Sequence, residues 1–94
     1  MQMSEWKTFS ETRVKAPSLV TWAYLRLVFT LMTTINAAPF RGLPPGACML
    51  RRVTCSPRQA GDALLTYTFA EVPTAERQET ALLYETADFS LLGI

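Results

Sequence analysis

Histidine is absent from this chain of 94 residues, and other residues that carry chemistry are few. Without histidine, the chain lacks the commonest general base, the commonest metal ligand and any Ser–His or Cys–His pair. Its four glycines fall in none of the spacings that cradle phosphate groups. Its carboxylates lie in polar stretches that are typical of a solvated surface. We therefore expect no enzyme activity, no small-molecule substrate, no cofactor and no metal site.

Cysteine is scarce too, with only Cys48 and Cys55 present. If both lie in one strand, seven residues separate their Cα atoms by about 23 Å, at about 3.3 Å per residue. A disulfide needs these atoms within about 7 Å, and zinc needs a second pair of ligands. The spacing predicts two free, mostly buried thiols in a reducing compartment.

Charged residues make up only 18% of the chain, against 49% hydrophobic residues. This length and composition predict one globular domain over residues 1–94, not a disordered segment. We expect an arm at 1–16, a helix-plus-hairpin core at 17–72 and a C-terminal extension at 73–94. The apolar share is high for so short a chain, which indicates that some apolar surface contacts a partner.

The charges are segregated along the chain. Residues 1–58 hold eight basic and two acidic side chains, a net charge of +6, whereas residues 59–94 hold one basic and six acidic, a net charge of −5. The two halves could pair inside one molecule. Alternatively, a bipolar subunit could stack head to tail, since opposite patches form heterologous contacts.

The most hydrophobic run, residues 18–35, has nearly the length that crosses a bilayer. Arg26 at its centre would cost roughly 2.5–3.5 kcal/mol to insert. On a helical wheel this arginine and three threonines share one strip, and apolar residues fill the remaining arc. The pattern predicts the central helix of the domain, ending at Asn36 as a left-handed cap. The residues expected in its core face are Trp22, Leu25, Val28, Phe29 and Met32.

A membrane-associated protein that uses residues 18–35 remains an alternative to this interpretation. A cleaved signal peptide is disfavoured because Glu5 and Glu11 precede the run.

The remaining segments predict strands and loops. Period-two or apolar patterns indicate strands near 7–14, at 47–55 and at 63–72, the last two joined by a hairpin loop at 56–62. Three prolines and two glycines make 36–46 a loop, with Phe40 packed back into the core. After Pro73 we expect a short helix capped by Thr74, then edge strands or a docking tail. The fold class is therefore α+β, with one central helix packed on a small antiparallel sheet.

The middle of the chain resembles small structural proteins encoded in tailed-bacteriophage genomes. The likeness covers residues 17–72 and depends on a helix that ends in asparagine, an F-x-G loop and a T-Y-x-F strand. These positions are Asn36, Phe40, Gly42, Gly46, Leu50, Thr66, Tyr67 and Phe69. The resemblance implies a virion neck, collar or tail component, built as a ring or stacked array and made in the host cytoplasm. It transfers no catalytic residue.

These observations predict a non-catalytic assembly protein whose partners are other protein subunits, including copies of itself. A small inhibitor that binds a host enzyme, located in the cytoplasm, is the main alternative. Nucleic acid is a weaker candidate because the pI of about 7.8 is low and lysine is scarce. The residues predicted to contact partners are Phe40, Arg51, Arg52, Arg58, Glu76, Glu79, Glu85 and Phe89.

Overall fold

The computed structural model describes residues 5–58 and 61–94 and shows a small α+β domain, 45 × 22 × 21 Å in extent. A mixed five-stranded sheet has the order β1-β4-β3-β2-β5. Its strands are β1 (Thr8–Lys15), β2 (Ile35–Asn36), β3 (Cys48–Pro57), β4 (Ala63–Glu71) and β5 (Thr86–Ala87). The helices are α1 (Trp22–Leu31) and α2 (Arg77–Leu83), with short 3-10 turns η2 (Pro17–Leu19), η3 (Thr74–Glu76) and η4 (Phe89–Leu92).

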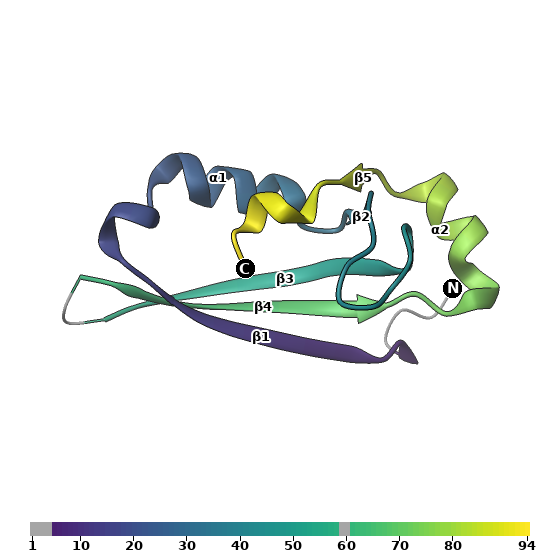
Figure 1. The fold of residues 1–94 in the computed structure, drawn as a ribbon, viewed down its shortest axis with the longest axis horizontal. Helices are drawn as coiled ribbons and strands as arrows, with labels where there is room; N and C mark the ends of the chain where they lie inside the picture. Colours follow the sequence, from purple (N-terminus) through teal and green to yellow (C-terminus); the bar gives the residue numbers. More distant parts are fainter. Residues whose placement is uncertain (1–4, 59–60) are drawn as a thin grey trace.

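The three long strands form an elongated antiparallel ribbon, and α1 and η4 lie over the same face of it (Figure 1). The covered face holds the main core, formed by apolar side chains of β3 and β4 beneath α1 and η4. On β4, Leu65, Tyr67 and Phe69 are fully buried while the alternate Thr66 and Thr68 are half-buried, which confirms the predicted alternation. The middle of the opposite face is polar: Ser10 pairs with Thr68 at 3.2 Å and Thr12 with Thr66 at 3.1 Å through their hydroxyl groups.

A bulge at Arg51 determines which side chains of β3 reach the core. The register moves from Leu50 opposite Phe69 to Arg52 opposite Thr68, so Arg51 is the extra residue. A one-residue shift moves every following side chain to the other face. Without the bulge, Arg52 would point into the core. With it, Val53 packs there and Arg52 is exposed.

The predicted helix at 18–35 is too long. The observed helix begins after Thr21, whose hydroxyl accepts a hydrogen bond from the Tyr24 amide at 3.1 Å, and ends at Leu31. Thr33 then takes a left-handed φ of 64°, and its amide donates to the Leu50 carbonyl at 2.7 Å. Pairing with β3 thus replaces the last helical turns, which suits a stretch rich in β-branched residues.

Asn36 is a buried strand residue, not a helix cap, so that prediction is also wrong. Its side-chain amide donates to the carbonyls of Ala38 at 2.8 Å and Pro44 at 3.0 Å. Its side-chain oxygen accepts from the Cys48 amide at 2.9 Å. One side chain therefore holds the 37–46 loop against the start of β3.

The strand predicted near 7–14 is confirmed as β1, and it makes the expected arm part of the sheet, because β1 pairs with β4 from Thr8 opposite Ala70 to Lys15 opposite Ala63. Trp6, just before it, is buried in a second cluster with Ile35, Met49 and neighbouring residues. The sheet is mixed, not antiparallel throughout, because β2 and β5 are parallel.

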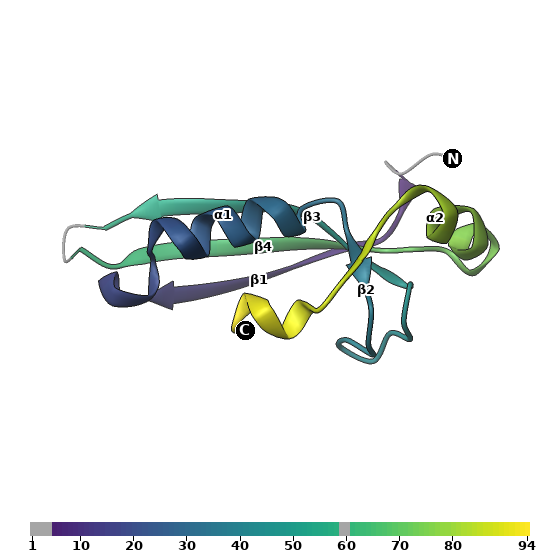
Figure 2. The same cartoon turned by 90° about the horizontal axis from the view of Figure 1, so that it is seen from above.

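The C-terminal extension folds back onto the domain (Figure 2). The edge strand expected after the short helix is present as β5, although its apolar approach, 81–83, ends α2 instead. Thr74 caps no helix through its side chain. The final segment is the η4 turn, whose Phe89 and Leu92 are buried in the main core. The ends of the sheet ribbon therefore differ: the β3–β4 hairpin lies at one and α2 at the other (Figure 1).

Candidate functional site

The arginines predicted to bind partners lie on the β3–β4 hairpin. Arg52 and Arg58 are exposed, and Arg51 is the half-buried bulge residue. The Arg58 guanidinium lies 3.3 Å from the Asp62 carboxylate, four residues away across the hairpin turn. This pair joins the basic and the acidic half of the sequence within the hairpin itself.

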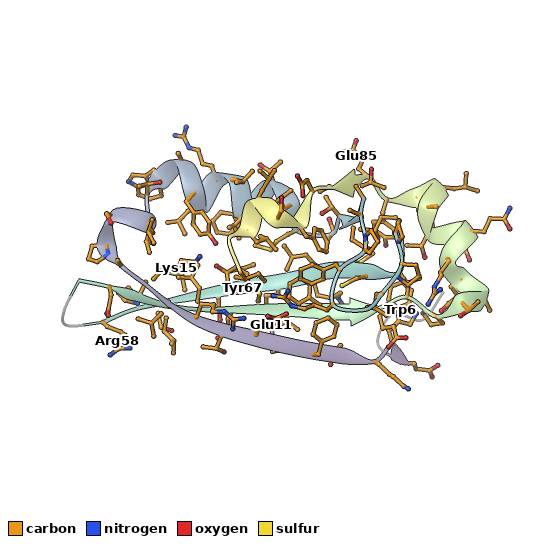
Figure 3. The ribbon with its side chains drawn as sticks, in the orientation of Figure 1. Trp6, Glu11, Lys15, Arg58, Tyr67 and Glu85 are labelled. Atoms are coloured by element: carbon orange, nitrogen blue, oxygen red, sulfur yellow. The ribbon has the colours of Figure 1, made fainter. Side chains whose placement is uncertain are left out.

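The predicted glutamates lie on and beside α2, away from the hairpin. Figure 3 shows Arg58 near the hairpin end and Glu85 beside β5, on the side towards α2. Glu79 and Glu85 are exposed. Glu76 has an internal role, because its carboxylate accepts a hydrogen bond from the Trp6 indole N–H at 2.7 Å. Of the three predicted glutamates, only Glu79 and Glu85 are therefore candidates for contact with a partner.

Phe40 and Phe89 belong to an aromatic cluster inside the molecule. Their ring centroids are 5.3 Å apart at an interplanar angle of 84°, and both rings also contact Phe69. Phe89 is only 4% exposed, so it cannot serve as an anchor for a partner. Phe40 is half-buried, and it packs the 37–46 loop against this cluster.

Sequence reasoning missed an apolar surface on the outer side of α1. Trp22 is 78% exposed and Phe29 is 64% exposed, although both were expected in the core. They lie seven residues apart, which is two helical turns, and exposed Arg26 lies on the same side between them. We call Trp22, Arg26 and Phe29 the α1 stripe. The helical wheel placed Arg26 in the polar strip correctly, but it gave no means of dividing a wide apolar arc into core and surface.

A second exposed apolar surface lies on α2. Leu82 is 83% exposed and Leu83 is 63% exposed, and Glu79 precedes them by three and four residues on the same side of the helix. We call Glu79, Leu82 and Leu83 the α2 stripe. Isolated exposed leucines are ordinary on protein surfaces, whereas two adjacent ones on a seven-residue helix form a patch.

The charged groups near the 37–46 loop hold the structure together. Glu11 on β1 accepts hydrogen bonds from Arg41 at 2.7 and 2.9 Å and from Arg13 at 2.9 Å. The Arg41 guanidinium, more than any other neighbour, holds the pKa of Glu11 below its ordinary value. A hollow lined by Phe9, Glu11, Arg41, Leu43 and Glu71 adjoins this pair. An ionised carboxylate bonded to two arginines is a structural group that ties the loop to the edge strand, and a poor proton donor.

No three potential metal ligands of the His, Cys, Asp and Glu types gather within residues 5–58 and 61–94. Over the same ranges, no helix has the length and apolar character needed to cross a bilayer.

The two cysteines lie in one strand and are free. They differ from the prediction in one respect, since Cys48 is buried and Cys55 is exposed near the hairpin end. Burial raises the pKa of the Cys48 thiol to about 12, so it remains protonated and inert at neutral pH.

No protein-family model, curated protein or solved structure matches this chain. The surfaces described above are therefore the basis for a functional proposal.

Proposed function

We propose that this domain is a non-catalytic assembly protein that binds further copies of itself through opposite ends of an elongated subunit. The observation that carries the proposal is the placement of the charges. Exposed Arg58 lies at the hairpin end, and exposed Glu79 and Glu85 lie on and just after α2, towards the other end of a molecule 45 Å long.

Such a distribution favours heterologous contacts. Among end-to-end contacts, a two-fold dimer would bring like charges together, whereas head-to-tail stacking brings unlike charges together. Heterologous contacts close into rings or continue as filaments. This geometry is compatible with a virion component of a tailed phage, the class that residues 17–72 resemble, and we propose the virion as its location.

Exposed apolar side chains also support the proposal of self-assembly. Charged pairs mainly set orientation and association rate, and apolar anchors contribute most of the affinity. Trp22 and Phe29 on α1 and Leu82 and Leu83 on α2 are large, exposed and positioned on regular helices. The α1 stripe would equally suit the groove of a host enzyme, which is the form that the inhibitor alternative takes.

Sedimentation velocity over a range of protein concentrations tests the proposal. We expect a concentration-dependent increase in sedimentation coefficient that weakens when salt is raised from about 50 mM to 500 mM, because salt screens the attraction between exposed charges. Replacing both Arg52 and Arg58 by Glu is expected to weaken association while the circular dichroism spectrum stays unchanged.

A protein that sediments as a monomer at every concentration and salt level would contradict self-assembly. Stoichiometric binding of that monomer to one host enzyme would then establish the inhibitor alternative.

A further inference from the structure

The α1 stripe and the α2 stripe have complementary chemistry. On α1, one arginine lies between two aromatic side chains, and on α2 one glutamate lies beside two leucines. Neither Arg26 nor Glu79 forms an ion pair with any residue that the structure describes. Both stripes are outward-facing, and they lie on different parts of the molecule (Figure 1), so they cannot meet within one subunit.

A symmetric contact between two α1 stripes is disfavoured. In an antiparallel pair, Trp22 of one copy would lie near Phe29 of the other, and the two Arg26 side chains would meet near the two-fold axis. Like charges placed together at an interface oppose association. An antiparallel contact between two α2 stripes would place Glu79 of one copy opposite Leu83 of the other, which leaves each carboxylate without a cation.

We infer that the α1 stripe of one copy binds the α2 stripe of the next, with Arg26 paired to Glu79 and the two leucines packed against Trp22 and Phe29. This inference rests on the proposed function, and it names the apolar anchors and one ion pair of the contact between subunits. Trp22 and Phe29 are about 10 Å apart along the helix at 1.5 Å rise per residue, which matches the length of the seven-residue α2. Arginine over an aromatic ring adds a further favourable interaction beside the ion pair.

The size of the contact predicts its strength. The two aromatic side chains expose on the order of 300 Å² of apolar surface, below the roughly 800 Å² per partner of a standard stable interface. Each contact is therefore expected to be weak, and assembly to need repeated contacts or a high local concentration. Closure into a ring would make every contact intramolecular in effect and stabilise the assembly cooperatively.

Two charge-reversed variants, Arg26→Glu and Glu79→Arg, test the pairing. Each alone places like charges at the proposed contact, so we expect self-association measured by sedimentation to weaken at least tenfold. In a 1:1 mixture, every contact between unlike variants joins opposite charges. The two introduced side chains face each other at one contact, and the native Arg26 faces the native Glu79 at the next. We expect the mixture to associate within about threefold of the unmodified protein.

Matched controls use exposed residues outside both stripes. Lys7→Glu makes the same change in net charge as Arg26→Glu, and Val14→Ser removes an exposed apolar side chain from β1. We expect association of both controls to stay within about twofold of the unmodified protein, whereas Phe29→Ser weakens it at least tenfold. Circular dichroism of every variant shows whether the subunit is folded.

Each outcome decides the matter. If the unmodified protein assembles and the reversed variants assemble equally well, or if the mixture fails to recover, the α1–α2 contact is wrong while self-assembly stands. If the unmodified protein remains a monomer throughout, both the contact and the proposed function are wrong.

Discussion

The hydroxyl groups of Tyr24 on α1 and Tyr67 on β4 are hydrogen-bonded to each other in the core. The Tyr24 hydroxyl also donates to the Leu92 carbonyl at 2.7 Å, so the Tyr67 hydroxyl is the donor in the pair. This relay joins the helix, the central strand and the C-terminal turn, three segments that are far apart in the sequence.

The direction of this relay predicts unequal effects of removing each hydroxyl. Tyr24→Phe leaves the Tyr67 hydroxyl without an acceptor and the Leu92 carbonyl without a donor, so we expect the free energy of unfolding to fall by about 2–3 kcal/mol. Tyr67→Phe leaves the hydrogen bond from Tyr24 to Leu92 intact, so we expect the free energy of unfolding to fall by about 1 kcal/mol. Urea unfolding of both single variants and the double variant checks this. Equal single effects, or strict additivity in the double variant, would contradict the relay.

Alkaline pH should destabilise the domain through Cys48, Tyr24 and Tyr67. Burial raises the pKa of Cys48 from 9.0 to about 12, and burial also raises the pKa values of Tyr24 and Tyr67 above 10.0. These groups keep their protons to higher pH in the folded state than in the unfolded chain. Below their pKa values in the unfolded chain, their contribution to the free energy of unfolding is therefore complete. That contribution is lost as pH rises towards their pKa values in the folded state.

Urea unfolding between pH 8 and pH 10.5 measures this effect. We expect the free energy of unfolding to fall with pH, with each of these groups contributing at most about 1.4 kcal/mol per pH unit. In the Cys48→Ala variant the slope between pH 9 and pH 10.5 should be shallower. A slope unchanged by that substitution would show that the Cys48 thiol does not contribute.

Neighbouring positions on α1 should respond very differently to the same substitution. Val28 is buried and Phe29 is exposed, so Val28→Asn places an unsatisfied amide in the core whereas Phe29→Asn places it in solvent. We expect about 2–4 kcal/mol of destabilisation for Val28→Asn and less than about 1 kcal/mol for Phe29→Asn. Thermal and urea unfolding provide the comparison, and similar losses for the two variants would contradict the orientation of α1.

This contrast also shows what the sequence could predict and why the rest was missed. Period-two or apolar patterns located β1, β3 and β4 to within two residues, and the alternation along β4 reported its buried face directly. The same reasoning failed at Trp22 and Phe29, because a helix in a small domain buries only the side that meets the sheet. The bulge at Arg51 left no pattern in the sequence, and pairing with β3 determined the end of α1 at Leu31.

The candidate site was predicted in part. Charge segregation was visible in the sequence, and Glu79, Glu85, Arg52 and Arg58 are exposed as expected of contact residues. Phe89 and Glu76 were misjudged, because their partners Phe40 and Trp6 come from segments 49 and 70 residues away. Contacts at that separation depend on the folded chain and have no local signal.

The two thiols should react at different rates in the native protein. Cys55 is exposed and Cys48 is buried, so a thiol reagent should modify one equivalent quickly and the second only after unfolding. Mass spectrometry after proteolysis identifies the modified residue, which we expect to be Cys55. Rapid modification of both, or a disulfide between them, would contradict the β3 assignment.

The sheet order also constrains how the chain can fold during its synthesis. The first long strand, β1, pairs only with β4, and β2 has its parallel partner in β5. A nascent chain emerging from the ribosome therefore holds an unpaired edge strand and an uncovered α1 until β4 and then β5 have followed. Because such non-local pairings slow folding and leave apolar segments exposed, newly made subunits should depend on chaperones until the whole sheet has emerged.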